Sequence, residues 1–209
     1  MIMEHKAIVG HRYFNITNLI IPCIYTVIGI LYRYFVHGVT IEMFLLVQAW
    51  LMMYEVSTEY FGYGAIYSKN NFGMEYLKTS SKGMTLVKKS MLTDSILRIL
   101  RTFAYTFIPA LLVKDTVDDW VLLLIFALVL ANVSVWSVSF VRYITMYGFL
   151  MIVSAPLIAV GIFIDDICSI SDSFQRPVTI IMSILVVSGV YFTQEFADRK
   201  IKASYSDIL

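Results

Sequence analysis

Two pairs of charged residues stand inside otherwise apolar stretches of the sequence. Glu55 and Glu59 are four residues apart, and Arg98 and Arg101 are three apart, so on helices each pair lies on one face. Two buried carboxylates at this spacing can serve as general acid and general base. The same carboxylates can instead neutralise the two arginines, because an unpaired charge at the centre of a membrane-spanning helix costs about 2.5 to 3.5 kcal/mol.

The elements that must position these residues are predicted to be membrane-spanning helices. The 209-residue chain is 59% hydrophobic and only 15% charged, and its mean hydropathy is +0.76. We therefore expect an all-α integral membrane protein that forms a single transmembrane domain over residues 1–209. A span needs about 20 apolar residues, and six segments qualify: 16–35, 41–64, 92–113, 120–140, 146–164 and 178–196.

The distribution of basic residues predicts the orientation of these spans. With a cytoplasmic N-terminus, only Arg33, Lys114 and Arg176 of the 16 basic residues fall outside. The positive-inside rule therefore places both termini in the cytoplasm. The N-terminal MIMEHKAIVGHRYFN is expected to be a short amphipathic segment that is retained, because it lacks the pattern of a signal peptide. Trp120 fits the outer start of the fourth span and Pro177 the first turn of the sixth.

The predicted register brings the charged pairs together. At a rise of 1.5 Å per residue, Glu55 and Arg101 lie about 21 and 18 Å from the outer ends of their spans, and Glu59 and Arg98 about 27 and 22 Å. Antiparallel packing of spans two and three would then pair Glu55 with Arg101 and Glu59 with Arg98. The alternative is that these residues lie at the cytoplasmic interface, reaching toward water or pairing with Asp94.

Residues 65–91 form the one long cytoplasmic loop, and this loop is basic. Asn70 and Asn71 are suited to cap a short helix, and Ser80, Ser81 and Gly83 are predicted to end it. A second helix is then expected from about Thr85 into the third span. The simple interpretation of the lysines is contact with anionic lipid headgroups.

The order of residues in this loop resembles that of a known family. The run is Gly73, Met74, Glu75, Tyr76, Leu77, Lys78, Thr79 and Ser80. It is similar to the stretch after the second span in the membrane subunits of ABC-2 type ABC transporters: glycine, a small or apolar residue, glutamate, an apolar residue, leucine, any residue, threonine or serine, then proline or serine. The resemblance implies a coupling helix that docks into an ATP-binding subunit. It also implies a permease of the bacterial plasma membrane that exports an amphipathic substrate such as a peptide or bacteriocin, a drug or a lipid.

The resemblance also predicts the partners. No G-x-x-x-x-G-K-[ST] phosphate loop occurs in the sequence, so ATP and Mg would be bound by a separate cytoplasmic ATP-binding subunit. This chain would then hold no cofactor and would not itself be an enzyme. Six spans are half of a translocation unit, which implies a second permease subunit, identical or related. The net charge of +1 gives no indication of nucleic-acid binding.

Other polar residues also lie within the predicted spans. Asn132, Trp136 and Ser139 follow a helical stripe that could line a pathway or form a helix contact, and Glu195 is expected to pair with Arg199. The three histidines are scattered, so no metal site is expected, and no serine and histidine are expected at one depth. The rival functions are an intramembrane enzyme that uses Glu55 and Glu59, and a substrate-capturing subunit of an import system.

Overall fold

The computed structural model describes residues 1–35, 63, 77, 79–112, 120–143, 162, 166 and 169–203. Within these residues every regular element is a helix and none is a strand, which confirms the expected all-α class. The elements are α1 (Ile2–Val9), α2 (His11–Asn15), the π-helical turn η1 (Ile16–Ile20), α3 (Ile21–Phe35), α6 (Ser81–Leu112), α7 (Trp120–Tyr143) and α10 (Asp172–Ala203).

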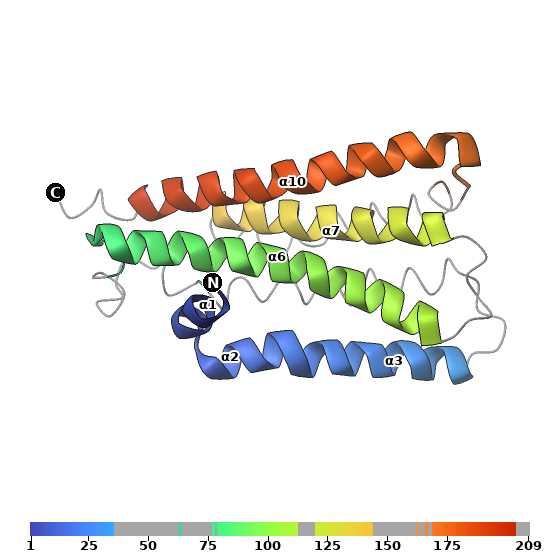
Figure 1. The fold of residues 1–209 in the computed structure, drawn as a ribbon, viewed down its shortest axis with the longest axis horizontal. Helices are drawn as coiled ribbons and strands as arrows, with labels where there is room; N and C mark the ends of the chain where they lie inside the picture. The colour runs from blue at the N-terminus through green and yellow to red at the C-terminus, as the bar shows by residue number, and fades with distance from the viewer. Residues whose placement is uncertain are drawn as a thin grey trace.

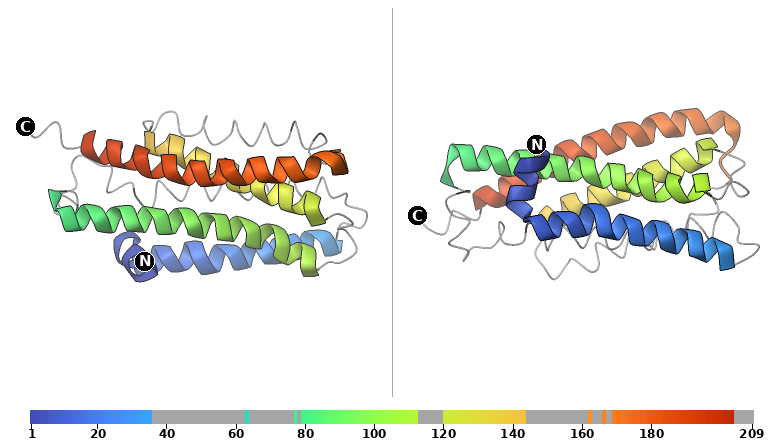
Figure 2. Two further views of the ribbon diagram at one scale, coloured as in Figure 1. Left: turned by 45° about the horizontal axis from the view of Figure 1, so that its top comes forward. Right: turned by 60° about the horizontal axis from the view of Figure 1, so that its bottom comes forward.

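The long helices α3, α6, α7 and α10 run along the molecule, and α1 lies against α6 next to α2 (Figures 1 and 2). α7 packs against both α6 and α10, and α3 packs against α6. Leu128 and Ala131 of α7 meet Val186 of α10, and Ile99 and Phe103 of α6 pack on the same cluster. α6 thus contacts α1 and all three of the other long helices, and α7 packs against α6 and α10.

The described helices pair in parallel as well as antiparallel directions. α3 and α6 run the same way, and α7 and α10 run together in the opposite direction (Figure 1). The contacts agree, because Asn132 bonds Met182 while the later residue Thr193 of α10 bonds Val135. α1 and the last residues of α10 lie toward the same end of the bundle (Figure 1).

Among the described helices, two are long and apolar enough to cross a membrane. The segment Trp120–Val138 of α7 has a mean hydropathy of 2.5, and Asp172–Arg199 of α10 has 1.6. In α7 67% of this stretch is buried, against 17% in α10, which turns Ile180, Ile184 and Val187 outward. By length and composition these helices fit a protein that crosses a membrane.

Six spanning helices were expected, and the described residues contain two that meet the length and hydropathy requirements. Segments 16–35 and 92–112 are helical, but α3 alone has 15 residues after η1, and α6 carries Asp94, Arg98 and Arg101. Of segments 41–64 and 146–164, the structure describes residues 63 and 162 and no others.

The predicted break before the third span is present at Ser80, a bend that follows the helical residue Thr79, but the second helix begins earlier than predicted. α6 begins at Ser81, and Ser80 is its N-cap, since the Ser80 hydroxyl accepts a hydrogen bond from the Gly83 N–H at 3.0 Å and its carbonyl accepts one from Met84 at 2.9 Å. Ser81 and Gly83 thus lie in the first turn of the helix, four residues before the predicted start at Thr85.

Two further boundaries differ from the prediction. α10 begins at Asp172, so Pro177 lies in its second turn and not its first. The side chain of Gln175 donates to Asp172 at 3.2 Å within the turn that precedes the proline. α7 continues past the predicted end of the fourth span at residue 140 and includes Arg142.

The N-terminal segment is not amphipathic in the expected sense. His5 is the only buried residue of α1, whereas Met1, Ile2 and Met3 are 55%, 55% and 86% exposed. The face of α1 toward the bundle is therefore polar at its centre, and its outer side is apolar.

Candidate functional site

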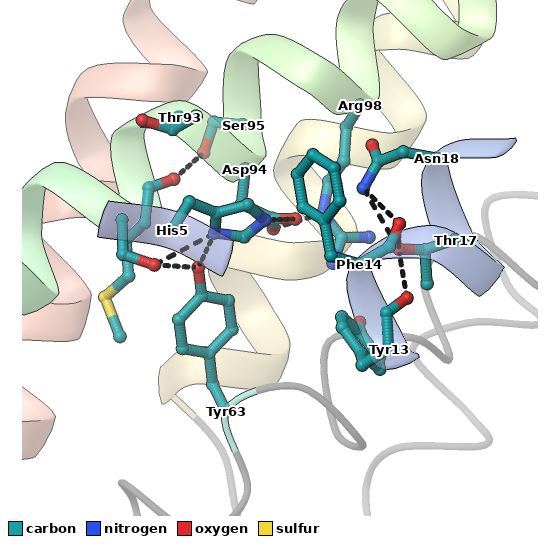
Figure 3. A network of polar contacts seen from close by, with 12 residues as sticks. His5, Tyr13, Phe14, Thr17, Asn18, Tyr63, Thr93, Asp94, Ser95 and Arg98 are labelled. Atoms are coloured by element: carbon teal, nitrogen blue, oxygen red, sulfur yellow. Dashed lines mark hydrogen bonds and ion pairs between the residues drawn. The ribbon is translucent and has the colours of Figure 1, made fainter. Parts of the chain in front are cut away.

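The most concentrated polar chemistry in the described structure lies where α1 packs on α6 (Figure 3). We call the following five residues the polar network: His5, Tyr63, Ser90, Asp94 and Arg98. Each is at most 2% exposed. Ser90, Asp94 and Arg98 recur every four residues, so they form one face of α6.

His5 reaches two hydroxyl groups through one ring nitrogen. Its Nδ1 lies 2.9 Å from Ser90 Oγ and 3.1 Å from the hydroxyl of Tyr63. Those two hydroxyls lie 2.9 Å from each other, which closes a triangle of hydrogen bonds. The edge of the imidazole packs against Phe14, with the ring centroids 5.7 Å apart.

Within the polar network, Asp94 and Arg98 form an ion pair. Arg98 Nε donates to Asp94 Oδ2 at 2.7 Å, and His5 Nε2 lies 3.9 Å from Asp94 Oδ1. Burial of both charges is tolerable because each has an opposite partner within hydrogen-bond distance. The network therefore places a positive and a negative side chain inside the bundle without leaving either isolated.

The N-terminal segment covers this face of α6 one turn further along. Arg101 Nη1 donates to the side-chain oxygen of Asn18 in η1. Asn18 in turn donates to the carbonyl of Phe14 at 3.0 Å. The N-terminal segment therefore contacts α6 through two polar side chains, His5 and Asn18.

The structure describes the arginines of the predicted ion pairs but not the glutamates. Glu55 and Glu59 lie outside the described residues, so their pairing with Arg101 and Arg98 stays a prediction. The alternative partner of Arg98, Asp94, is in place at 2.7 Å.

The expectation that no serine and histidine share one depth is wrong. Ser90 and His5 are hydrogen bonded, with Asp94 near the other imidazole nitrogen. The sequence prediction placed His5 in a short amphipathic segment and overlooked the four-residue recurrence from Ser90 to Arg98, which marks a polar helix face. Because Ser90 is fully buried, it presents no nucleophile to solvent.

A set of ion pairs surrounds the start of α6. Asp198 of α10 binds Lys88 and Lys202, each at 2.7 Å, and Lys89 lies 3.8 Å from Glu4 of α1. The hydrogen bond from Lys202 to Asp198 raises the pKa of Lys202 above its ordinary value. The base of α6 is thereby connected to both α1 and α10.

The polar stripe of α7 is a helix contact. Asn132 donates to the carbonyl of Met182 on α10 at 2.9 Å, and the Trp136 ring lies 5.8 Å from that of Phe192. The side chain of Ser139 lies outside the described residues. The predicted pair of Glu195 with Arg199 is confirmed at 3.2 Å.

The predicted coupling segment is described only near its end. Leu77 packs on the cluster around Val87 and Met91. A Cβ atom at Gly83 would collide with the backbone of Leu77, so the chain passes close to the first turn of α6 there. The remaining segment residues outside the described structure are Gly73, Met74, Glu75, Tyr76 and Lys78.

In the part of the chain that the structure describes, no cluster of His, Cys, Asp and Glu is arranged to hold a metal ion. Neither the protein-family models, nor the curated proteins, nor the solved structures gave a match to this chain.

Proposed function

We propose that this chain is the membrane-spanning permease subunit of an ABC-2 type ABC transporter. It would export an amphipathic substrate, a peptide, drug or lipid, using ATP hydrolysis in a separate cytoplasmic subunit. The observation that carries the proposal is the start of α6 at Ser81, directly after the segment Gly73–Ser80. The helix continues unbroken from there to Leu112 inside the bundle.

An unbroken α6 is mechanically suited to coupling. Its 32 residues correspond to about 48 Å at 1.5 Å per residue. A helix of this length moves as one body, so a displacement at its start reaches the core contacts of Ile99 and Phe103 with α7. The two lysines near its base hold α10 and α1 through Asp198 and Glu4.

The directions of the helices support the six-span topology. If α7 and α10 both cross the membrane, they cross in the same direction, so the chain has to return once between them. The predicted span 146–164 lies between them in the sequence. The same reasoning applies to α3 and α6 and the predicted span 41–64. An even number of crossings also agrees with the position of α1 and the end of α10 toward one end of the bundle (Figure 1).

The test is copurification with an ATPase. The tagged protein is purified from its native membrane in mild detergent, partners are identified by mass spectrometry, and ATP hydrolysis is measured. We expect an ATP-binding subunit with the parent chain and its loss on combined Glu75→Ala, Tyr76→Ala and Lys78→Ala substitution. Lys82→Ala is the matched control, since Lys82 is an exposed lysine just beyond the segment.

A parent protein that purifies alone and without ATPase activity would refute the transporter proposal. Glu55→Gln and Glu59→Gln variants would then test the rival intramembrane enzyme.

A further inference from the structure

We propose that α1 is a releasable clasp on the base of α6 and that His5 is the residue that positions it. The proposal concerns the N-terminal segment itself and does not depend on a transport function. It is built on three features of the described residues: how α1 is attached, what its release would leave behind, and where it can bend.

The attachment of α1 depends mainly on one polar side chain. His5 is fully buried, while Met1, Ile2 and Met3 face outward. The apolar contact of α1 with the bundle comes from Ile8 and Val9. These two residues are only partly buried, and they pack against the cluster that includes Val87, Met91, Ala197 and Ile201. The outer ion pair of Glu4 with Lys89 is long, at 3.8 Å, and half exposed, so it adds little.

Release of His5 would not strand its two hydroxyl partners. Ser90 and Tyr63 are hydrogen bonded to each other at 2.9 Å, and that bond does not involve the imidazole. Asp94 likewise keeps its 2.7 Å bond to Arg98. A buried polar group that loses its only partner is expensive, and here each partner retains another. The undocked state is therefore accessible without breaking the bond of Tyr63 to Ser90 or that of Arg98 to Asp94.

The chain has a bend at the right position for such a movement. Gly10, between α1 and α2, has φ +87°, and among the described residues it alone has positive φ. Beyond it, the bond of Asn18 to Arg101 anchors η1 on α6. α1 can thus swing about Gly10 while η1 stays in place.

The position of the clasp gives it a mechanical consequence. Ser90 lies in the third turn of α6, next to Lys88, which binds Asp198 of α10. The base of α6 is held between α1 and α10, and release of α1 removes one of these two supports.

The experiment measures a distance distribution across the clasp by pulsed electron paramagnetic resonance. Spin labels are attached at Met3→Cys and Lys82→Cys, both exposed sites, in a chain that also carries Cys23→Ser and Cys168→Ser. The parent is expected to show a dominant docked distance. His5→Ala should lower the ratio of docked to undocked protein about tenfold, the change that about 1.4 kcal/mol produces.

Two control variants separate positioning by His5 from general loss of structure. His5→Asn places a polar atom near the position of Nδ1 and should restore the docked distance. Ala7→Ser, on the exposed side of the same helix, should leave the parent distribution unchanged.

An unchanged distribution in folded His5→Ala protein would overturn the proposal. If that variant aggregates on size exclusion, Gly10→Ala decides the question, because a Cβ there meets no atom but is strained at positive φ. Gly10→Ala should also reduce the docked fraction, and a parental distribution would contradict the clasp.

Discussion

At the scale of single residues, the same pairing of a carboxylate with an arginine four residues later occurs in two environments. Asp94 and Arg98 are buried on α6 and joined at 2.7 Å, whereas Glu195 and Arg199 are exposed on α10 and joined at 3.2 Å. The spacing predicts both pairs equally well from sequence. Burial, which the sequence does not show, determines how much each contributes to stability.

We therefore expect matched substitutions in the two pairs to lower the stability of the protein by very different amounts. Asp94→Asn removes the carboxylate that pairs with a fully buried arginine, and such a loss typically costs about 3 to 5 kcal/mol. Glu195→Gln removes an exposed helix pair worth about 0.3 to 0.5 kcal/mol. Thermal unfolding in detergent, followed by circular dichroism, should show a large fall in midpoint for the first variant only. Equal unfolding midpoints for the two variants would mean that the pairing of Asp94 with Arg98 contributes no more to the stability of the bundle than the exposed pair does.

His5 shows why part of the site escaped prediction at this scale. Its local sequence, with Glu4 and Lys6 as neighbours, is typical of an exposed segment. Only the tertiary contact of α1 with Ser90 and Tyr63 makes it a buried residue.

At the scale of helices, the error at the start of α6 has a local cause. Ser80, Ser81 and Gly83 all favour turns, so together they predict a break. The same serine chemistry also caps helices, and Ser80 does so by accepting the N–H of Gly83. Turn propensity therefore located the boundary correctly but assigned Ser81 and Gly83 to the wrong side of it. Trp120, by contrast, starts α7 as predicted.

The contact between α7 and α10 depends on a glycine. A Cβ at Gly189 would lie 2.9 Å from Val135 Cγ1 and 3.0 Å from the Trp136 ring nitrogen. We expect Gly189→Ala to destabilise the bundle by about 1 to 3 kcal/mol through overpacking. This outcome opposes helix propensity, which favours alanine over glycine by about 1 kcal/mol. The midpoint of thermal unfolding in detergent measures it.

The neighbouring Ser188→Ala is the control for this helix contact, because Ser188 is half-buried and its hydroxyl donates to the carbonyl of Leu185 in the same helix. If Gly189→Ala were as stable as the parent or more so, the two helices would have room to separate and the glycine would not set their approach.

At the scale of the whole molecule, composition predicted the helical class, because a chain with 59% hydrophobic residues needs its backbone hydrogen bonds satisfied within helices if it enters a membrane. The number of spans could not be derived as securely. α6 carries Asp94, Arg98 and Arg101 within its apolar stretch and fails a hydropathy criterion, although its partners make those charges tolerable in the bundle. Local hydropathy does not include such tertiary pairing, and this limits any count made from sequence.

The last prediction concerns the sidedness of the complete chain. Six crossings would put the two termini on one side of the membrane, and the distribution of basic residues predicts that this side is the cytoplasm. Epitope tags at the N- and C-termini should therefore become accessible to antibody only after the cytoplasmic membrane is permeabilised. In a chain with Cys23→Ser and Cys168→Ser, a cysteine at Thr116 in the acidic link 114–119 should react with a membrane-impermeant maleimide from outside. Tags on opposite sides would require an odd number of crossings. That result would contradict six spans. It would also contradict the arrangement in which α3 and α6, and likewise α7 and α10, cross in the same direction with a single return span between them.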